Sequence, residues 1–326
     1  MSVFWRTIHE VKIVYQPGTP LSAKAYLAFG HEWLDSSALI RREQQTTQAC
    51  NQSSLLKHEE TQADTSAYLE QVRRYYDRMN PLILKHVGNT YQTSLLKTDS
   101  TADPYCATNL YCAAQAGIKP GHRVLDAGCG AGGPSIDIAR NIEGVAIDAI
   151  TLSPAQAQTA EELVQQAGLA DRIQVHIGDF HHLPFADEVF DVVLFLESAV
   201  YSYDRQQLFA EAYRVLRPGG SLYIKEPFSK ELPLSDQQRQ EIQAANRVYV
   251  CKIARVSESI QTISGVGFQN IRSRDLSEIF RTNVFSEAML EYKHGLPWLS
   301  EFGKSHYYQF QYQSGFFGEI KACKPS

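Results

Sequence analysis

The 326-residue sequence lacks the usual marks of membrane, secreted and nucleic-acid-binding proteins. No uninterrupted apolar run is longer than that at Val192–Leu196, which is far short of the ~20 residues that cross a bilayer. The first residues, MSVFWRTIHEVKIVYQ, contain no apolar stretch or cleavage site of a secretory signal, so none is expected. With 31 Lys and Arg against 36 Asp and Glu, the net charge is −5, and no block of like charges predicts a nucleic-acid surface.

Closely spaced cysteines are also absent. The six cysteines are scattered without a C-x-x-C pair, which favours reduced thiols over a disulfide framework or a zinc site. Apolar residues make up 44% and charged residues 21%, enough for an ordinary core. The composition therefore predicts a cytoplasmic α/β protein without a transmembrane segment, most consistent with an enzyme. Its length fits two domains or one enlarged domain.

From residue 105 onward, predicted helices alternate with predicted strands, which is typical of βαβ crossovers and a mainly parallel sheet. Apolar runs and turn residues predict strands at 123–127, 144–150, 172–177, 190–196 and 221–226, then at 268–273 and 316–323. Helices are predicted at 105–117, 134–141 and 204–216. Another begins at Ser153-Pro154, with Ser as N-cap and Pro at the first helical position.

The two flanks of this pattern are less regular. Ser66–Met79 has helical spacing of apolar residues, and Pro81 is expected to stop or reset that helix. The polar segment Arg41–Ser66 fits either a solvated helix or a mobile connection. Beyond residue 227 we expect a polar helical stretch, Ser235–Arg255, and a mixed stretch, Asp275–Gly303.

A glycine-rich turn follows the first predicted strand of the alternating region. Gly128, Gly130 and Gly133 satisfy G-x-G-x-x-G, and Asp148 lies 20 residues after Gly128. Glycines in such a turn let the backbone approach a ligand at a helix N-terminus. On these facts alone the turn could bind NAD, or it could be a purely structural tight turn.

Asp126 argues against a dinucleotide. It stands two residues before Gly128, at the end of the strand, where a carboxylate would repel a pyrophosphate but would suit a cationic amine or sulfonium. On the next strand, Thr151 occupies the tip where a ribose-binding group is expected. Asp148 falls earlier, where the sheet should bury it.

In this order and spacing, D-A-G-C-G-A-G-G (126–133), T-L-S-P-A-Q (151–156), G-D-F (178–180) and L-R-P-G-G (216–220) resemble the class I S-adenosylmethionine-dependent methyltransferases. The resemblance implies an α/β fold with a doubly wound, seven-stranded, mostly parallel sheet whose last strand is antiparallel. It also implies a division into an N-terminal extension with a helical lid (1–104) and a methyltransferase domain (105–326), with helical caps near 228–255 and 275–305.

The same resemblance implies a binding site for S-adenosylmethionine. The turn around Asp126 would hold the methionine end, and Asp179 and Phe180 would flank the adenine; alternatively, Asp179 is only a turn residue or helix cap. Most family members have an acidic residue where this chain has Thr151, and a threonine there resembles enzymes acting on isoprenoid carbons, including the tocopherol and prenyl-diphosphate types. The predicted cofactor contacts are Tyr91, Gln92, Asp126, Gly128, Gly130, Gly132, Thr151, Leu152, Gln156, Asp179 and Phe180.

Glu197 is the predicted catalytic residue. It follows five apolar residues at the carboxyl end of a strand, where α/β proteins bind ligands. Burial there would raise its pKa and make it a plausible base, unless it merely caps a helix or forms a salt bridge. E-S-x-x-Y, from Glu197 to Tyr201, resembles the corresponding segment of geranyl-diphosphate C-methyltransferases, in which this Glu is implicated as base or cation stabiliser.

Tyrosines elsewhere in the sequence would complete the part of the site where methyl transfer takes place, which we call the reacting end. Tyr75-Tyr76-Asp77 and G-N-T-Y-Q (88–92) resemble the lid sequence of these C-methyltransferases, although Tyr75 and Tyr76 equally fit the buried stripe of a helix. Tyr249 is assigned to face the substrate. Arg247, Lys252 and Arg255 could receive a diphosphate or could simply be surface residues. The adjacent His181-His182 is interpreted as a surface turn rather than a metal site, and no metal ligand is predicted.

The sequence thus predicts a small-molecule methyltransferase, favoured as C-methylation of an isoprenoid alkene such as a prenyl diphosphate, with Glu197 as base and Tyr76, Tyr201 and Tyr249 beside it. A diphosphate substrate would make a Mg²⁺ requirement plausible, and a homo-oligomer is compatible with the sequence. The alternatives are N- or O-methylation of a polar metabolite and, in another class, a non-catalytic S-adenosylmethionine-binding protein.

Overall fold

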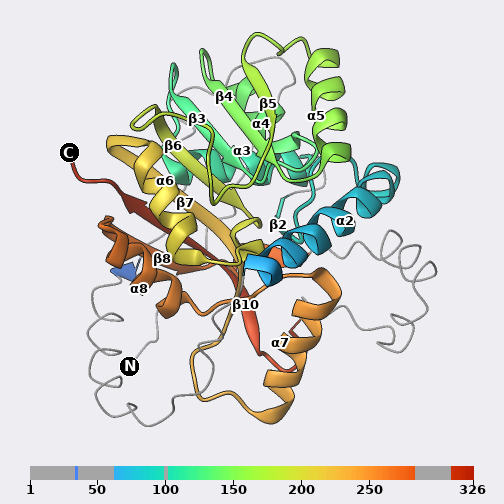
Figure 1. Cartoon of the computed structure of the whole chain (residues 1–326), viewed down its shortest axis with the longest axis vertical. Helices are drawn as coiled ribbons and strands as arrows, with labels where there is room; N and C mark the ends of the chain where they lie inside the picture. The colour runs from blue at the N-terminus through green and yellow to red at the C-terminus, as the bar shows by residue number, and fades with distance from the viewer. Residues whose placement is uncertain (1–33, 36–61, 99–101, 283–309) are drawn as a thin grey trace, which may run out of the picture.

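The computed structural model describes residues 34–35, 62–98, 102–282 and 310–326. A large sheet crosses the molecule, with helices on both of its faces and further helices at one end (Figure 1). Most of the segment 41–66, predicted as a solvated helix or a connection, lies outside the described residues. Among the described residues, no helix is both long and apolar enough to span a membrane.

Eight strands form this sheet in the order β1-β8-β10-β7-β6-β3-β4-β5. The strands from β5 to β7 pair in parallel, and β10 lies antiparallel between β7 and β8. The predicted seven-stranded sheet with an antiparallel last strand is confirmed, and the two-residue β1 adds a short edge strand. The bounds are β1 Leu34–Asp35, β3 Arg123–Ala127, β4 Ala146–Thr151, β5 Ile173–Ile177, β6 Phe190–Leu196, β7 Leu216–Ser229, β8 Gln269–Asp275 and β10 Gly315–Cys323.

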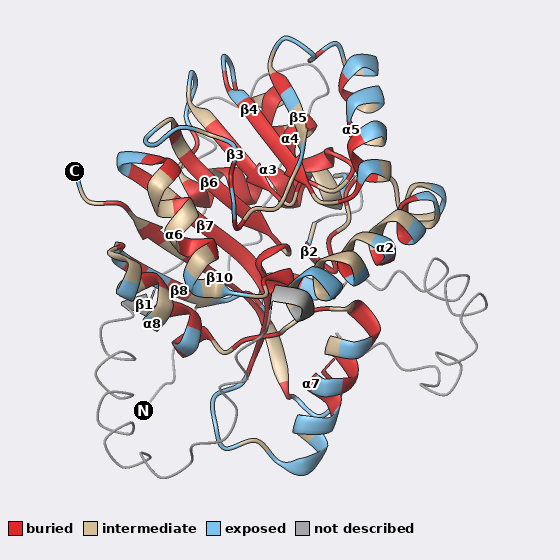
Figure 2. Cartoon of the chain, in the orientation of Figure 1, coloured by how far each residue is buried: buried red, intermediate tan, exposed pale blue. Residues whose placement is uncertain are grey.

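The helices are divided between the two faces of the sheet. Alternate strand residues point to opposite faces, so Val124 packs in a cluster with α3, α4 and α5, whereas Leu125 packs with α6 and α8. Because both faces are covered, the central strands are almost wholly buried (Figure 2). The bounds are α3 Pro104–Ala116, α4 Gly133–Asn141, α5 Pro154–Gln166, α6 Arg205–Val215 and α8 Val256–Val266.

Local capping residues set where several of these helices begin. Ser153 accepts a hydrogen bond from the backbone N–H of Gln156 with Pro154 at the first position, as predicted for α5. Asp204 caps α6 in the same way through the N–H of Gln207. The alternative role for Glu197, as the cap of this helix, is therefore wrong.

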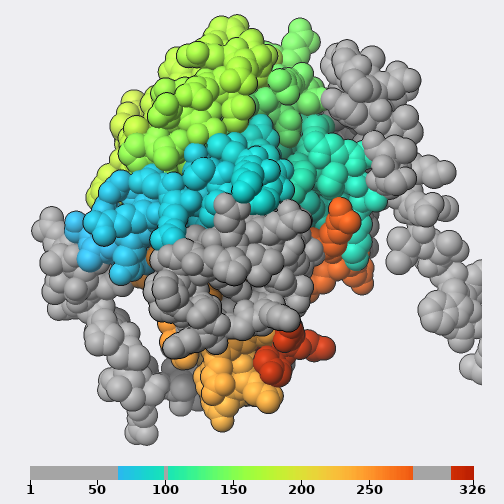
Figure 3. Space-filling model, turned by 90° about the vertical axis from the view of Figure 1, so that its right-hand side faces the viewer, coloured from blue at the N-terminus to red at the C-terminus, as the bar shows by residue number. Residues whose placement is uncertain are grey.

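A third group of elements covers the carboxyl ends of the parallel strands. It comprises α2 (Gln62–His86), α7 (Asp236–Tyr249) and the short helix η2 (Ala199–Tyr201), which share an apolar cluster. We call residues 62–98 the lid segment; it includes β2 (Ser94–Leu96), which pairs with β9 (Phe280–Thr282). Asn80 joins α2 to α5 by hydrogen bonds to Ala155 O and Thr159 Oγ1. Figure 3 shows the lid segment as a blue-to-cyan band against the green residues of the sheet domain.

Two predictions about these helices need correction. Pro81 does not stop α2, which continues to His86, because Met79 and Ile83 on either side are buried in the shared cluster and packing offsets the lost backbone hydrogen bond. The helix expected over 235–255 ends at Tyr249. Residues 250–255 lead instead into α8, which was not predicted. The cap expected near 275–305 falls largely outside the described residues.

Candidate active site

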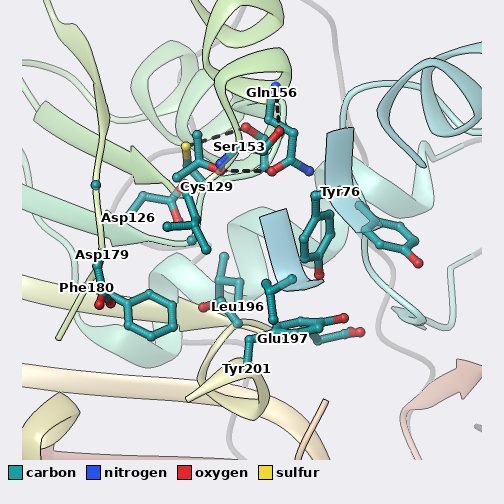
Figure 4. Close-up of a pocket in the computed structure, with 18 of the residues that line it drawn as sticks. Tyr76, Asp126, Cys129, Ser153, Gln156, Asp179, Phe180, Leu196, Glu197 and Tyr201 are labelled. Carbon is teal, nitrogen blue, oxygen red and sulfur yellow. Dashed lines mark hydrogen bonds between the residues drawn. The ribbon is translucent and has the colours of Figure 1, made fainter. Parts of the chain in front are cut away.

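A cavity lies where β3, β4 and β6 end beneath the lid segment. It spans about 800 Å³ of space, part of which is open to solvent. Figure 4 shows Tyr76, Glu197 and Tyr201 at one end, and Cys129, Ser153 and Gln156 at the other. The lining residues are Leu69, Val72, Tyr76, Tyr91, Gln92, Asp126, Gly128, Cys129, Gly130, Pro134, Thr151, Leu152, Ser153, Gln156, Gly178, Asp179, Phe180, Leu196, Glu197, Ser198 and Tyr201.

The glycine-rich turn between β3 and α4 forms one wall. Gly128 has φ +93°, and a Cβ atom there would lie 2.3 Å from Ser198 Cβ, so only glycine fits. Gly133 allows a second close approach, because a Cβ on it would lie 2.2 Å from Thr90 Oγ1 of the lid segment. The glycines thus bring the turn against both β6 and the lid.

Asp126 is 1% exposed and lies at the base of this turn. Burial raises its pKa to about 6, although a hydrogen bond that Ser135 Oγ donates to its Oδ2 (2.6 Å) acts in the opposite direction. A buried carboxylate with little compensating charge is a favourable partner for a cationic group and an unfavourable one for a phosphate.

The end of β4 forms a second wall. The Thr151 hydroxyl donates to Gln156 Oε1 (2.9 Å), so both predicted contacts meet at the cavity, and Leu152 lines it as well. Asp148 is buried within the sheet as predicted and pairs with Arg123 and His176. It does not line the cavity, which removes the acidic residue that an NAD site would need.

Asp179 and Phe180 form the third wall. Burial alone would raise the pKa of Asp179, but hydrogen bonds from His181 and Tyr203 outweigh this effect and hold the pKa below its usual value. His181 is fully buried, with Nδ1 2.6 Å from Asp179 Oδ1 and Nε2 2.8 Å from Ser202 Oγ. The prediction of a surface turn is therefore wrong for His181, which holds Asp179 in place.

Glu197 lies at the reacting end, with its backbone in the left-handed region (φ +58°) and a side chain only 7% exposed. Its Oε1 accepts from Lys225 Nζ (2.6 Å), Ser94 N (3.2 Å) and Ser94 Oγ (3.4 Å). Its Oε2 accepts from Thr93 N (2.7 Å) and the Thr93 hydroxyl. The salt-bridge alternative is thus present as well, and these donors fix the orientation of the carboxyl group.

Tyrosine rings surround this carboxylate. Tyr76 lines the cavity edge-on to Tyr201, with ring centroids 5.1 Å apart, and to Tyr91 at 6.0 Å. Burial raises the pKa of Tyr76 well above its usual value, so the ring is a neutral phenol. Tyr75 is buried in the apolar cluster and its hydroxyl lies 3.0 Å from that of Tyr91. Tyr75 therefore fits the interpretation as part of the buried stripe of a helix, and Tyr76 fits the interpretation as a lid residue that faces the cavity.

Some predicted residues lie outside the cavity wall. Gly132 serves as N-cap of α4, and Tyr249 is buried in the apolar cluster. Lys252 lies over the ring of Tyr68, and Arg255 faces Glu231 and Glu258, while Arg247 is exposed on α7.

The sequence analysis missed Lys225, Thr93 and Ser94, which hold Glu197. The sign that could have pointed to Lys225 was a lysine among the largely apolar residues 222–228 of β7. Within the described part of the chain, no group of three or more His, Cys, Asp or Glu side chains could hold a metal ion.

Comparison with known proteins agrees with this geometry. Residues 125–224 match the family described as "Methyltransferase domain". Methyltransferase GfsG of Streptomyces halstedii is 34% identical over 162 residues, which cover 48% of this chain and 58% of that protein. The sterol 24-C-methyltransferase of Pneumocystis carinii is 31% identical over 185 residues, covering 56% and 48%. The chain spans about half the length of these relatives.

Solved structures share the fold. The cyclase SpnF superposes with a TM-score of 0.66 at 23% identity, covering 79% of this chain and 97% of that one. The geranyl diphosphate C-methyltransferase of Streptomyces coelicolor, solved with Mg²⁺, geranyl diphosphate and S-adenosyl-L-homocysteine, gives 0.61 at 19% identity, covering 79% and 97%. Residues 125–224 therefore match a methyltransferase domain, and the described residues have the fold of the class I S-adenosylmethionine-dependent methyltransferases. Sterol 24-C-methyltransferases are among the proteins similar in sequence, and a geranyl diphosphate C-methyltransferase is among those similar in fold.

Proposed function

We propose that the protein transfers a methyl group from S-adenosylmethionine to a carbon of an isoprenoid alkene, such as a prenyl diphosphate, with Glu197 as base. The observation that carries this proposal is the composition of one cavity. A glycine turn with a buried carboxylate forms one part, and a glutamate paired with Lys225 near tyrosine rings forms another. The relatives that methylate sterols and geranyl diphosphate support the same chemistry.

The residues around the turn fit the cofactor. Asp126 would hold the ammonium group of its methionine end, while Thr151 and Gln156 would face the ribose and Asp179 and Phe180 the adenine. The cofactor supplies a methyl group on a sulfonium, and the protein aligns the acceptor carbon and excludes water. The apolar cluster that the lid segment shares with α7 and the short helix η2 would provide that exclusion.

Methylation of a double bond leaves a carbocation, which the tyrosine faces and the Glu197 charge would stabilise. Glu197 would then remove a proton from the adjacent carbon. We assign this step to Oε2, because the Thr93 hydroxyl can rotate its proton away and free a lone pair, whereas Lys225 holds Oε1. A diphosphate substrate would bind as its Mg²⁺ complex, so magnesium would enter the cavity as part of the substrate.

A labelled-methyl assay tests the reaction. The enzyme is incubated with ¹³C-methyl S-adenosylmethionine and, separately, geranyl diphosphate, a sterol alkene and a panel of amines and hydroxy compounds. We expect a new carbon–carbon bond in an alkene product. Exclusive labelling of nitrogen or oxygen would establish the alternative N- or O-methyltransferase. Binding without turnover would leave a cofactor-binding protein or another reaction, as in the structurally similar cyclase.

The pKa of Asp126 predicts how cofactor affinity depends on pH. In the free protein this carboxyl gains a proton as the pH falls through about 6, and the neutral form cannot pair with an ammonium. The affinity for S-adenosylhomocysteine should therefore fall as the pH is lowered from 7 to 5, by up to about tenfold per unit. Calorimetry on the protein and on Asp126→Asn checks this. The variant should bind weakly with a flatter profile, and parallel profiles would refute the ammonium contact.

A further inference from the structure

Lys225 is a fully buried ammonium group whose three donors each have an acceptor. On β7, with 0% exposure, its Nζ donates to Gln92 Oε1 (2.7 Å), Ser94 O (2.6 Å) and Glu197 Oε1 (2.6 Å). Burying an ammonium is unfavourable unless it is fully paired. All three acceptors are therefore needed to keep this charge inside the protein.

These acceptors come from two separate parts of the chain. Glu197 follows β6, the strand beside β7, where Leu196 pairs in register with Lys225. Gln92 and Ser94 belong to the lid segment, more than 100 residues earlier in the sequence. The ammonium thus joins the lid directly to the carboxylate at the reacting end of the cavity.

The lid side of this junction is held in one orientation. Gln92 Nε2 donates to Asn109 Oδ1 (2.7 Å), and Asn109 Nδ2 donates to Asp137 Oδ2 (2.7 Å) and Thr90 Oγ1 (3.3 Å). Gln92 and Asn109 are both buried. Because Asn109 takes the amide hydrogen of Gln92, the carbonyl oxygen of Gln92 is left to face Lys225.

We infer that Lys225 is a positioning residue that couples closure of lid residues 90–96 to the orientation of Glu197. With the lid in place, the ammonium is fully paired and the carboxylate is held by Thr93, Ser94 and Lys225. If the lid residues leave, Lys225 loses two of its three acceptors and Glu197 loses four of its five donors. Closure and an oriented base therefore occur together. The part played by Glu197 in this coupling rests on the proposed function.

Hydrogen exchange tests the coupling without any methyl acceptor. The amides of Thr93 and Ser94 are measured with S-adenosylhomocysteine bound, in the protein, in Lys225→Met and in Gln92→Leu. We expect both variants to exchange at least about tenfold faster at these amides, as for a locally opened segment. The matched control is Lys321→Met on β10, whose Nζ donates to Gln115 O outside the cavity. Unchanged exchange in a folded Lys225→Met or Gln92→Leu would overturn the inference.

Turnover separates positioning from simple structural support. Once an acceptor is known, Lys225→Met should lower kcat by about 10²-fold, the effect of a misplaced catalytic group, with a smaller change in KM. Added to Glu197→Gln, the same substitution should cost no more than about twofold, because Lys225 acts through Glu197. If the double variant instead lost kcat by the product of the two single-variant effects, the inference would be contradicted. If no methyl acceptor were found, the proposed function would be in doubt. The hydrogen-exchange experiment would still decide whether Lys225 couples the lid to Glu197, because it needs no acceptor.

Discussion

Replacement of Glu197 by glutamine is expected to reduce kcat for methyl transfer by about 10²- to 10⁴-fold, the usual contribution of a general base. The amide has nearly the same shape but cannot take the proton or balance a carbocation. The affinity for S-adenosylhomocysteine should change little, since Asp126, Thr151 and Asp179 lie on the other walls of the cavity. Initial rates with the acceptor found in the labelled-methyl assay, and calorimetry with S-adenosylhomocysteine, provide the measurement.

Two further variants make this result interpretable. Glu197→Asp keeps the charge at a shorter reach and should retain part of the activity. Glu241→Gln changes another buried glutamate, which accepts hydrogen bonds from Ser314 and Tyr312 outside the cavity, and should leave turnover unchanged. Full turnover by Glu197→Gln with every acceptor would remove the base assignment.

Gly128→Ala is expected to abolish detectable cofactor binding or to destabilise the fold by about 2–5 kcal/mol, from left-handed strain and overpacking together. A Cβ atom would lie 2.3 Å from Ser198 Cβ, and Gly128 has φ +93°. Because Ser198 directly follows Glu197, the clash would also reach the catalytic end. Thermal unfolding and calorimetry with S-adenosylhomocysteine measure the two effects.

Gly130→Ala is the matched control for this substitution. Gly130 also has a positive φ (+56°), but the atom nearest to an added Cβ would be Gln156 Nε2 at 3.7 Å, an ordinary contact. In thermal unfolding, Gly130→Ala should therefore lose only the stability due to the backbone preference, about 1–2 kcal/mol. Combining Gly128→Ala with Ser198→Gly should restore part of the loss. Equal behaviour of Gly128→Ala and Gly130→Ala would show that close packing against Ser198 is unimportant.

The sheet and most of the cavity wall could be predicted because they depend on local patterns. Strand β3, the turn from Asp126 to Gly133 and the Ser153 cap are each encoded within a few neighbouring residues. Their relative positions follow from the rule that parallel strands end at one edge. Glu197 could be placed for the same reason, since it directly follows the apolar run of β6.

The residues that were missed depend on contacts between distant segments. Lys225 had no local partner, and its acceptors lie on the lid segment and after β6. His181 appeared to belong to a surface turn because its partner Ser202 is 21 residues away. Pro81 was expected to end α2, because the local rule for proline carries no information about the tertiary packing of Met79 and Ile83.

The central claim is that the cavity beneath the lid binds S-adenosylmethionine through Asp126 and the glycine turn. Calorimetric titration of the full chain with S-adenosylhomocysteine, and separately with NAD, tests it most directly. We expect saturable binding of S-adenosylhomocysteine at one site per chain, weakened by Asp126→Asn, with no binding of NAD. Binding of NAD in the absence of any S-adenosylhomocysteine binding would contradict it.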